Sequence, residues 1–358
     1  GLVRGSHPGY LPGNDVPDLV AALKGDALPP PGSGMLHKIH VVRAPGSKLG
    51  YSGAAFGVLE VMIEDVTGQA FPTYMREAVL VPLGMHRSAF GWPDTIRQHA
   101  ATPHNLWSDT APIRRFTGDA WGNLNTTARD LGQWLAAAVD GPSAPRGRSV
   151  LSPSTIDSML TVNQGKFGVS YEAETLPDGT ELWGHSGWNL GWMSRVHIDP
   201  ETGNGLVVIT NADPYGFMVT RGAHCAWVKA DYGVSFDRFC QESATALAAA
   251  AFHDTTATAA IAQVRAQIKA NPEAIYVDEN EFYVLGYRLL EHRNVHHAIE
   301  VFRWNVDVHP DAWNAYDSLG EAYMRAGERE KAIRNYEKSL DLNPDNDNAR
   351  RMLEKLRP

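Results

Sequence analysis

Cysteine, positive charge and long apolar runs are all scarce in this chain of 358 residues. The two cysteines, Cys225 and Cys240, are too few for a disulfide framework or a cysteine-rich metal site, and they leave open one bridge or two free thiols. No apolar run reaches the roughly 18 residues that a membrane-spanning helix needs, so we expect no membrane span. The formal net charge of −9 argues against nucleic acids and anionic membranes as main partners, because both attract basic surfaces.

The sequence also lacks an initiating methionine, since it begins with Gly1. Its opening letters, "GLVRGSH", are compatible with the remnant of a cleavable tag or with native sequence. A signal peptide is not recognisable, but without the natural start this absence says nothing about the cellular compartment.

The N-terminal half shows the periodicity of amphipathic helices. From Ala54 onwards, apolar residues recur at spacings of three and four, and Gly68 suits the end of that helix. Another helix is expected after Thr126 or Thr127, either of which can cap it with its side chain. Residues 91–120 show no clear period, which predicts a long irregular surface segment of the kind that often carries function.

The pattern changes from helices to strands after residue 180. Three strand-like runs occupy residues 181–188, 193–199 and 205–212, and the turn sequence "PETGNG" joins the second run to the third. We therefore expect a meander of antiparallel strands. A helix near residues 220–229 is expected to cover it.

The C-terminal part contains an internal repeat with a period of 34 residues. Residues 236–277, which precede it, are rich in alanine and predict a helical connector. Small residues, an aromatic residue and a proline recur at matching positions: Gly286 and Gly320, Ala298 and Ala332, Phe302 and Tyr336, Pro310 and Pro344. This pattern resembles two tetratricopeptide repeats, at about 278–311 and 312–345, followed by a capping helix. Such arrays present a groove to peptides or protein partners, so residues 278–358 are a candidate interaction surface.

Two short stretches contain residues that could carry chemistry. "YSG" places Tyr51 at the start of the first amphipathic helix, and "GHSGWNLGW" places His185 in a strand. Taken alone, Tyr51 is more simply a packing residue, because a phenol with a pKa near 10 is a poor base unless its surroundings tune it. His185 alone is more simply a satisfied core histidine. The small residues that follow it allow another chain to approach, and the N–H groups of a strand edge can form an oxyanion hole. His197 and His224 are expected to be structural or surface residues.

Three segments taken together resemble the serine β-lactamase-related family, which contains class C β-lactamases, D-stereospecific peptidases and many esterases. The segment around "PGSKLGYSGAAFGVLEVMIEDVTG" resembles the one that carries the Tyr-x-Asn motif of that family. "GHSGWNLGW" resembles its third motif, in which Lys-Thr-Gly is often replaced by His-x-Gly, and "LNTTARDLGQWL" resembles the segment between them. The resemblance covers residues 1 to about 230.

The resemblance implies an α+β fold, with an antiparallel sheet flanked by helices and a helical lobe beside it. We therefore expect a partial hydrolase domain at residues 1–235, a helical connector at 236–277 and an all-α repeat segment at 278–358. By the same resemblance the protein is exported to the periplasm or secreted, although a cytoplasmic location remains open.

The family reading also implies roles for individual residues in acyl-enzyme chemistry on a small ester or amide substrate. Tyr51 would shuttle the proton of a nucleophilic serine, and His185 would position the substrate and tune the tyrosine. The backbone N–H of Trp188 would supply half of the oxyanion hole. Neighbouring positions are expected to contact the substrate: Ser52, Gly53, Ser186, Gly187 and Asn189. No cofactor and no metal site are expected.

Two departures from the family pattern affect the expected substrate. Gly53 stands where the motif has an asparagine that contacts substrate amides, and glycine cannot make that contact. His185 stands where β-lactamases have a lysine, which removes a fixed positive charge for a substrate carboxylate. Both differences favour esters or small amides over β-lactams.

The largest departure is that no serine is followed three residues later by a lysine, so the nucleophile motif Ser-x-x-Lys is absent. The chain is then a fragment of a longer hydrolase, or a degenerate domain, or one whose nucleophile comes from another segment. We favour the fragment and expect the chain alone to be inactive and poorly folded. Ser52 and Ser186 are weak substitutes. The alternative function is a non-catalytic protein-interaction module that uses the repeats.

Overall fold

The computed structural model describes residues 9–26, 39–44, 46–47, 49–104, 110–139, 150–163, 165–212, 215–234, 240–252, 254–291 and 293–357. The chain divides into two compact units, Gly1–Ser235 and Phe236–Pro358, and each is considered by itself. Among the described residues, no helix combines the length and the apolar character that crossing a bilayer requires.

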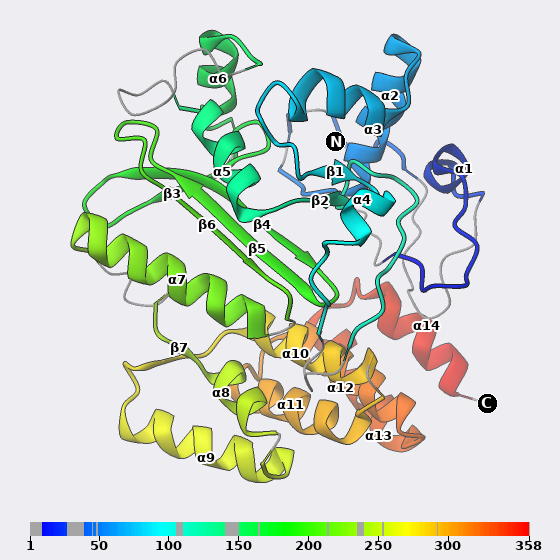
Figure 1. Cartoon of the computed structure of the whole chain (residues 1–358). Coiled ribbons are helices and arrows are strands. Elements are labelled where there is room, and N and C mark those ends of the chain that lie inside the picture. The colour runs from blue at the N-terminus through cyan, green and yellow to red at the C-terminus, as the bar shows by residue number, and fades with distance from the viewer. Residues whose placement is uncertain are drawn as a thin grey trace. The chain divides into compact units, whose positions relative to one another are not determined.

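A four-stranded antiparallel sheet lies at the centre of the first unit (Figure 1). Its strands are adjacent in chain order: β3 (Glu172–Thr175), β4 (Glu181–Asn189), β5 (Trp192–Ile198) and β6 (Gly205–Thr210). The expected meander of three strands is confirmed as β4, β5 and β6, with the "PETGNG" turn between the last two. The additional strand, β3, has the polar sequence Glu-Ala-Glu-Thr, which gives little strand signal.

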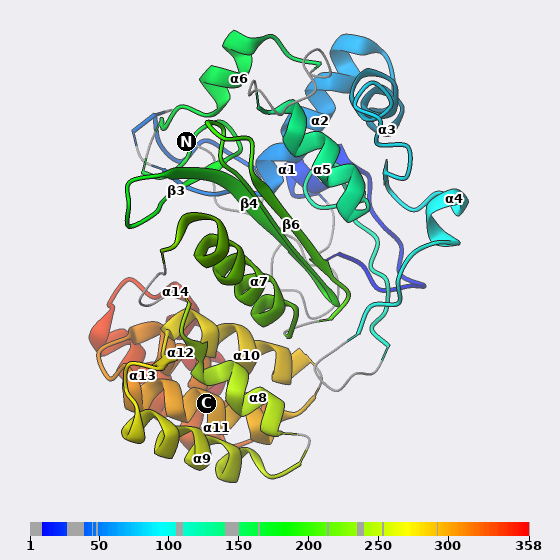
Figure 2. The same ribbon diagram turned by 60° about the vertical axis from the view of Figure 1, so that its left-hand side comes forward.

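Helices cover both faces of this sheet (Figure 2). Helix α5 (Ala128–Ala137) packs on one face, and α7 (Tyr215–Tyr232) packs on the other. The side chains between α5 and the sheet form a core, because strand residues that point to one face alternate with those that point to the other: Leu135, Ala138, Val139, Tyr171, Trp183, Val196 and Ile198. The helix expected near 220–229 is confirmed as the longer α7.

The remaining elements of the first unit form a helical lobe and short connections. They are α1 (Leu19–Lys24), α2 (Ala54–Thr67), α3 (Phe71–Met75), the π-helical turn η1 (Arg76–Leu80), β1 (Ala89–Phe90), α4 (Asp94–Arg97), β2 (Leu124–Asn125) and α6 (Pro153–Met159). Gly68 ends α2 with a φ of 68°, a left-handed conformation that glycine adopts at little cost. The Thr127 side chain accepts the N–H of Asp130 and caps α5. Both predicted helix boundaries are confirmed.

The irregular segment between β1 and β2 is closed at its base. Residues Ala89 and Phe90 pair with Asn125 and Leu124. Asp130 is buried, and it accepts the N–H of Arg87 at 2.8 Å and the hydroxyl of Ser88 at 2.7 Å. The described part of 91–120 contains one short helix, α4, as the missing periodicity predicts.

The second unit consists of stacked helices and one short pair of strands. Its elements are β7 (Glu242–Ser243), α8 (Ala244–Ala251), α9 (Ala257–Ala270), β8 (Ile275–Tyr276), α10 (Glu279–Glu291), α11 (Val295–Val308), α12 (Trp313–Arg325), α13 (Arg329–Leu342) and α14 (Asp347–Leu356). Gly286 lies against the Phe302 ring, and Gly320 lies against the Tyr336 ring, 34 residues further along. The predicted repeat thus appears as two helix pairs, each with its small residue against the aromatic ring of its partner helix.

Candidate active site

Tyr51 and His185 lie side by side in the first unit. Tyr51 precedes α2, and His185 is in the middle of β4; their ring centroids are 6.2 Å apart. Tyr51 is 49% exposed, and His185 is half-buried, so both rings are accessible from the surface. Two residues separated by more than a hundred positions in the sequence therefore lie close together in the fold.

The surroundings of Tyr51 oppose loss of its proton. Partial burial raises the pKa of Tyr51 above its ordinary value, and the nearby carboxylate of Glu172 raises it further, because a phenolate beside a carboxylate is repelled. Nζ of Lys166 lies 2.8 Å from Oε2 of Glu172, so the ammonium offsets part of the negative charge of that carboxylate. At neutral pH the phenol is therefore protonated.

The end of β4 forms an edge of the sheet in the part of the chain that the structure describes. β3 pairs with residues 181–184, so the stretch from His185 to Asn189 extends beyond β3, and it pairs with β5 on its other side. Ser186 and Trp188 are exposed, and His185, Gly187 and Asn189 are half-buried. Gly187 has a packing reason as well, since a Cβ atom there would lie 2.5 Å from Oγ of Ser194.

A third segment, residues 118–123, completes the group. Nδ2 of Asn189 donates to the carbonyl oxygen of Gly122 at 2.8 Å, which ties the end of β4 to this segment. On its other side, a Cβ atom at Gly57 of α2 would lie 2.8 Å from the Trp121 ring, so glycine permits that close approach. Residues 118–123, which directly precede the family-like stretch that begins at Leu124, therefore contact both of the other two stretches.

Glu60 is a residue of this region that sequence reasoning missed. It is 5% exposed, and its carboxylate accepts the N–H of Ala120 at 2.8 Å. Burial is the main cause that raises the pKa of Glu60 above its ordinary value. The sequence contained one sign that Glu60 is special. It lies four residues after Phe56, which puts it on the inward face of an amphipathic helix, where a charged residue is unusual.

Two of the residues that were expected to contact the substrate, Ser52 and Gly53, are buried. Ser52 is 8% exposed, and its carbonyl accepts the N–H of Ala55 at the start of α2. Gly53 is buried and caps α2 through its backbone. A surface cavity elsewhere in the unit is formed by the segment from Val81 to Arg87 and by α5, and none of the predicted site residues lines it.

Comparison with known proteins finds two family models that match parts of this chain. The model of the family described as Beta-lactamase matches residues 10–225, and that described as Tetratricopeptide repeat matches residues 313–346. Among curated relatives, Protein flp of Staphylococcus aureus (strain N315) is 23% identical over 202 residues, covering 55% of this chain and 38% of the relative. Penicillin-binding protein 4 of Amycolatopsis lactamdurans is 25% identical over 188 residues, covering 47% of this chain and 48% of the relative. The chain thus spans less than half of the length of either relative.

Two solved structures are among those to which this chain is similar. A penicillin-binding protein homologue from Pyrococcus abyssi, described as octameric, is 23% identical, with a TM-score of 0.45 over 52% of this chain and 44% of that one. A D-amino acid amidase from Ochrobactrum anthropi SV3, complexed with D-phenylalanine, is 23% identical, with a TM-score of 0.42 over 51% of this chain and 63% of that one.

Proposed function

The chain belongs to the β-lactamase family, and from this premise we propose that it is part of a serine hydrolase that acts through an acyl-enzyme on esters or on small amides and peptides. The observation that carries the proposal is the position of Tyr51 beside His185, where two of the family-like segments meet. A tyrosine and a histidine at the mouth of a strand edge can transfer a proton and orient a substrate.

Each residue has a specific role in this proposal. Tyr51 accepts the proton of the nucleophile and delivers it to the leaving group. His185, 6.2 Å away between ring centroids, orients the substrate and the phenol. The backbone N–H of Trp188 supplies one half of the oxyanion hole, supported by its place in an exposed edge segment. The substrate lies along positions near these groups: Ser52, Gly53, Ser186, Gly187 and Asn189.

We also propose that a segment outside these residues supplies the nucleophile and its lysine. Two observations support this. The first is electrostatic: Tyr51 has a raised pKa, and a lysine ammonium beside it would lower that pKa and make the phenol an effective base. The second is an exposed apolar stripe on α2, directly after Tyr51, with the spacing of a helix face that packs against another element: Val58, Leu59, Met62 and Val66.

The two departures from the family motifs direct the proposal toward esters and small amides. Gly53 offers no amide to a substrate, and the imidazole of His185 is a weaker partner for a substrate carboxylate than the lysine it replaces. β-Lactams carry such a carboxylate, so their binding would lose a charged contact.

The test uses the longer protein that contains this chain together with a Ser-x-x-Lys segment. It is incubated with p-nitrophenyl esters and with nitrocefin, as wild type, as Tyr51→Phe and as Tyr74→Phe, a control tyrosine in α3. We expect ester turnover to exceed nitrocefin turnover, and Tyr51→Phe to reduce kcat by a factor of about 100 to 10,000, because a proton-transfer group is lost. Tyr74→Phe should retain activity. Full ester turnover in Tyr51→Phe would refute the assigned role.

A second candidate function is a protein-interaction module, favoured by the tetratricopeptide match at residues 313–346. It predicts that the longer protein has no turnover and that residues 278–358 bind a peptide partner. An active-site serine trapped by a fluorophosphonate probe would exclude this as the sole function.

A further inference from the structure

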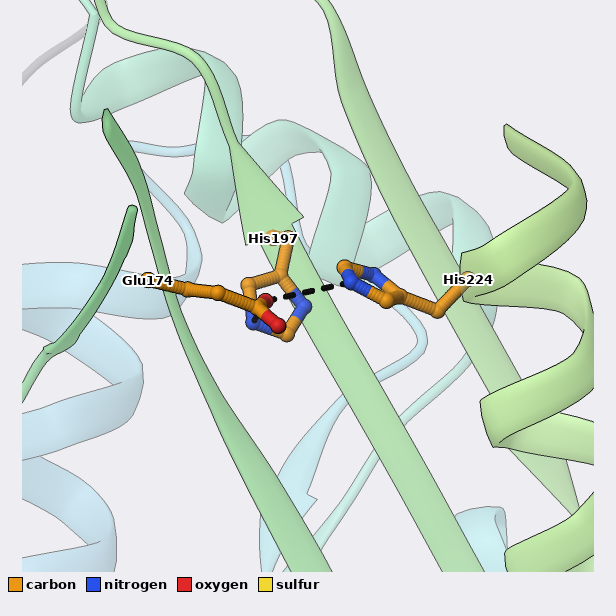
Figure 3. Close-up of side chains that lie close together, drawn as sticks. All are labelled: Glu174, His197 and His224. Carbon is orange, nitrogen blue, oxygen red and sulfur yellow. Dashed lines mark ion pairs between the residues drawn. The ribbon is translucent and has the colours of Figure 1, made fainter. Parts of the chain in front are cut away.

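Three side chains that the proposed hydrolase chemistry does not use converge between the sheet and α7 (Figure 3). Glu174 comes from β3, His197 from β5 and His224 from α7. The side chain of His224 is fully buried, that of His197 is 6% exposed and that of Glu174 is 23% exposed. Residues from three separate elements therefore meet in the interior of the unit.

The spacing of their ligand atoms matches a metal coordination shell. Oε2 of Glu174 lies 3.1 Å from Nε2 of His197 and 3.1 Å from Nε2 of His224, and one ligand atom from each residue lies within 4.8 Å of the others. In a tetrahedral zinc site with bonds of about 2.0–2.1 Å, neighbouring ligand atoms are about 3.3 Å apart. Small adjustments of the side chains would therefore bring all three atoms to bonding distance of one ion.

Hydrogen bonds among the three side chains explain this arrangement less well than a bound metal ion does. Both imidazole nitrogens approach the same oxygen atom, and that buried Oε2 makes no hydrogen bond of good geometry to any described residue. The other ring nitrogen of His197, Nδ1, is equally buried and likewise makes none among the described residues. Buried polar atoms nearly always have a partner, and a bound ion is one that would satisfy Oε2.

The backbone around the cluster is shaped to accommodate His197. Gly184 lies opposite His197 in the β4–β5 register, so both belong to the face that α7 covers. A Cβ atom at Gly184 would lie 2.6 Å from Cδ2 of His197 and 2.0 Å from the carbonyl oxygen of Val196. Only glycine fits there, so the strand backbone leaves room for this ring.

Arg195 is 9% exposed and lies near Glu174 and Glu172. Three protein ligands leave one tetrahedral position for a water or a small anion.

We propose that Glu174, His197 and His224 form a zinc site that fastens α7 to strands β3 and β5. Two imidazole nitrogens with one carboxylate oxygen suit zinc, whereas magnesium and calcium prefer oxygen ligands. The site lies on the face of the sheet opposite to α5. The proposal does not depend on the hydrolase activity.

The experiment uses the full chain, treated with EDTA and dialysed, and measures binding of ZnCl₂ by calorimetry and the bound metal by mass spectrometry. We expect one zinc per chain and a higher Tm with zinc, but no increase in Tm with MgCl₂. Glu174→Gln and His197→Gln should each weaken zinc binding by more than about 100-fold, because even outer-shell partners of metal ligands account for 10–100-fold. The control His86→Gln, at an exposed histidine, should bind as the wild type does.

Cobalt substitution tests the proposal without any variant. Co²⁺ bound by the wild-type chain should show the intense visible absorption of tetrahedral nitrogen and oxygen coordination, and ZnCl₂ should displace it. A folded wild-type chain, judged by circular dichroism, that binds neither ion would overturn the proposal. So would weak octahedral cobalt bands, or a Glu174→Gln variant with unchanged zinc affinity.

Discussion

The two units differ in how completely they bury their own apolar surface. Among the described residues, the four largest side chains that are fully buried all belong to the second unit, here called the repeat unit: Trp304, Tyr336, Phe282 and Phe302. Most of the exposed large apolar side chains in the described ranges belong instead to the first unit, here called the hydrolase-like unit, and several of them cluster on α2 and just before it. A repeat stacks on its neighbour and closes its core locally. The hydrolase-like unit instead exposes an apolar face on α2.

The two units therefore differ in how much apolar surface they leave available for contact with other elements. In the first unit the exposed apolar side chains of α2 lie directly after Tyr51, so any element that packed on them would also approach the proposed site. In the second unit, α8 and α9 already pack against the repeats.

The largest expected effect compares the same substitution in both units. Leu289 is fully buried in α10, and Leu59 is 46% exposed on α2. Leu289→Ala should lower the opening free energy of the repeat unit by about 2–5 kcal/mol, since it leaves a cavity. Leu59→Ala should change that of the first unit by less than about 0.5 kcal/mol. Hydrogen exchange of peptides from each unit measures both, and similar losses would abolish the contrast between the units.

A smaller effect is expected where a methyl group is added instead of removed. A Cβ atom at Gly286 would lie 2.2 Å from the Phe302 ring, so Gly286→Ala should destabilise the repeat unit by about 1–3 kcal/mol. Gly222 in α7 has nothing within 4 Å of such an atom. Gly222→Ala should therefore leave the free energy of unfolding unchanged or raise it by up to about 1 kcal/mol. Thermal unfolding checks both variants, and an unchanged Tm in Gly286→Ala would mean that the repeat core is looser than the structure shows.

The smallest expected effect is electrostatic and concerns the pKa of Tyr51 in the first unit. Glu172→Gln should lower the pKa of Tyr51, because it removes the carboxylate that repels the phenolate and leaves the positive charge of Lys166 unbalanced. The phenol would then lose its proton at a lower pH than in the wild type. The pH titration of ¹³C-labelled tyrosine, assigned with Tyr51→Phe, measures the change. Glu181→Gln, at the exposed far end of β4, is the control, and an equal shift there would contradict a local cause.

Elements with strong local signals could be predicted from the sequence. The apolar period of α2, the capping threonine of α5, the turn after β5 and the 34-residue repeat each depend on residues close together in the chain, and the structure confirms them. The pairing of Tyr51 with His185 rested on resemblance to a family. Nothing local to either residue indicates that they meet.

The features that could not be predicted depend on contacts between distant segments. β3 is short and polar, so its two glutamates carry no strand signal, and Glu174 gave no reason to connect it with His197 or His224. Both histidines, expected to be structural or surface residues, are buried. Gly187 illustrates a different limit, because the sequence suggested room for a substrate, whereas the structure also shows close packing on Ser194.

The base of the segment between β1 and β2 has a consequence for how this protein can diversify. Its two ends are held by the β1–β2 pair and by Asp130. Near its C-terminal end it is also held by α2, through the Glu60–Ala120 hydrogen bond and the packing of Trp121 on Gly57. Through the Gly122–Asn189 bond this segment reaches the rim of the proposed site. Substitutions at its exposed positions could alter the shape of that rim while the framework around it stays the same.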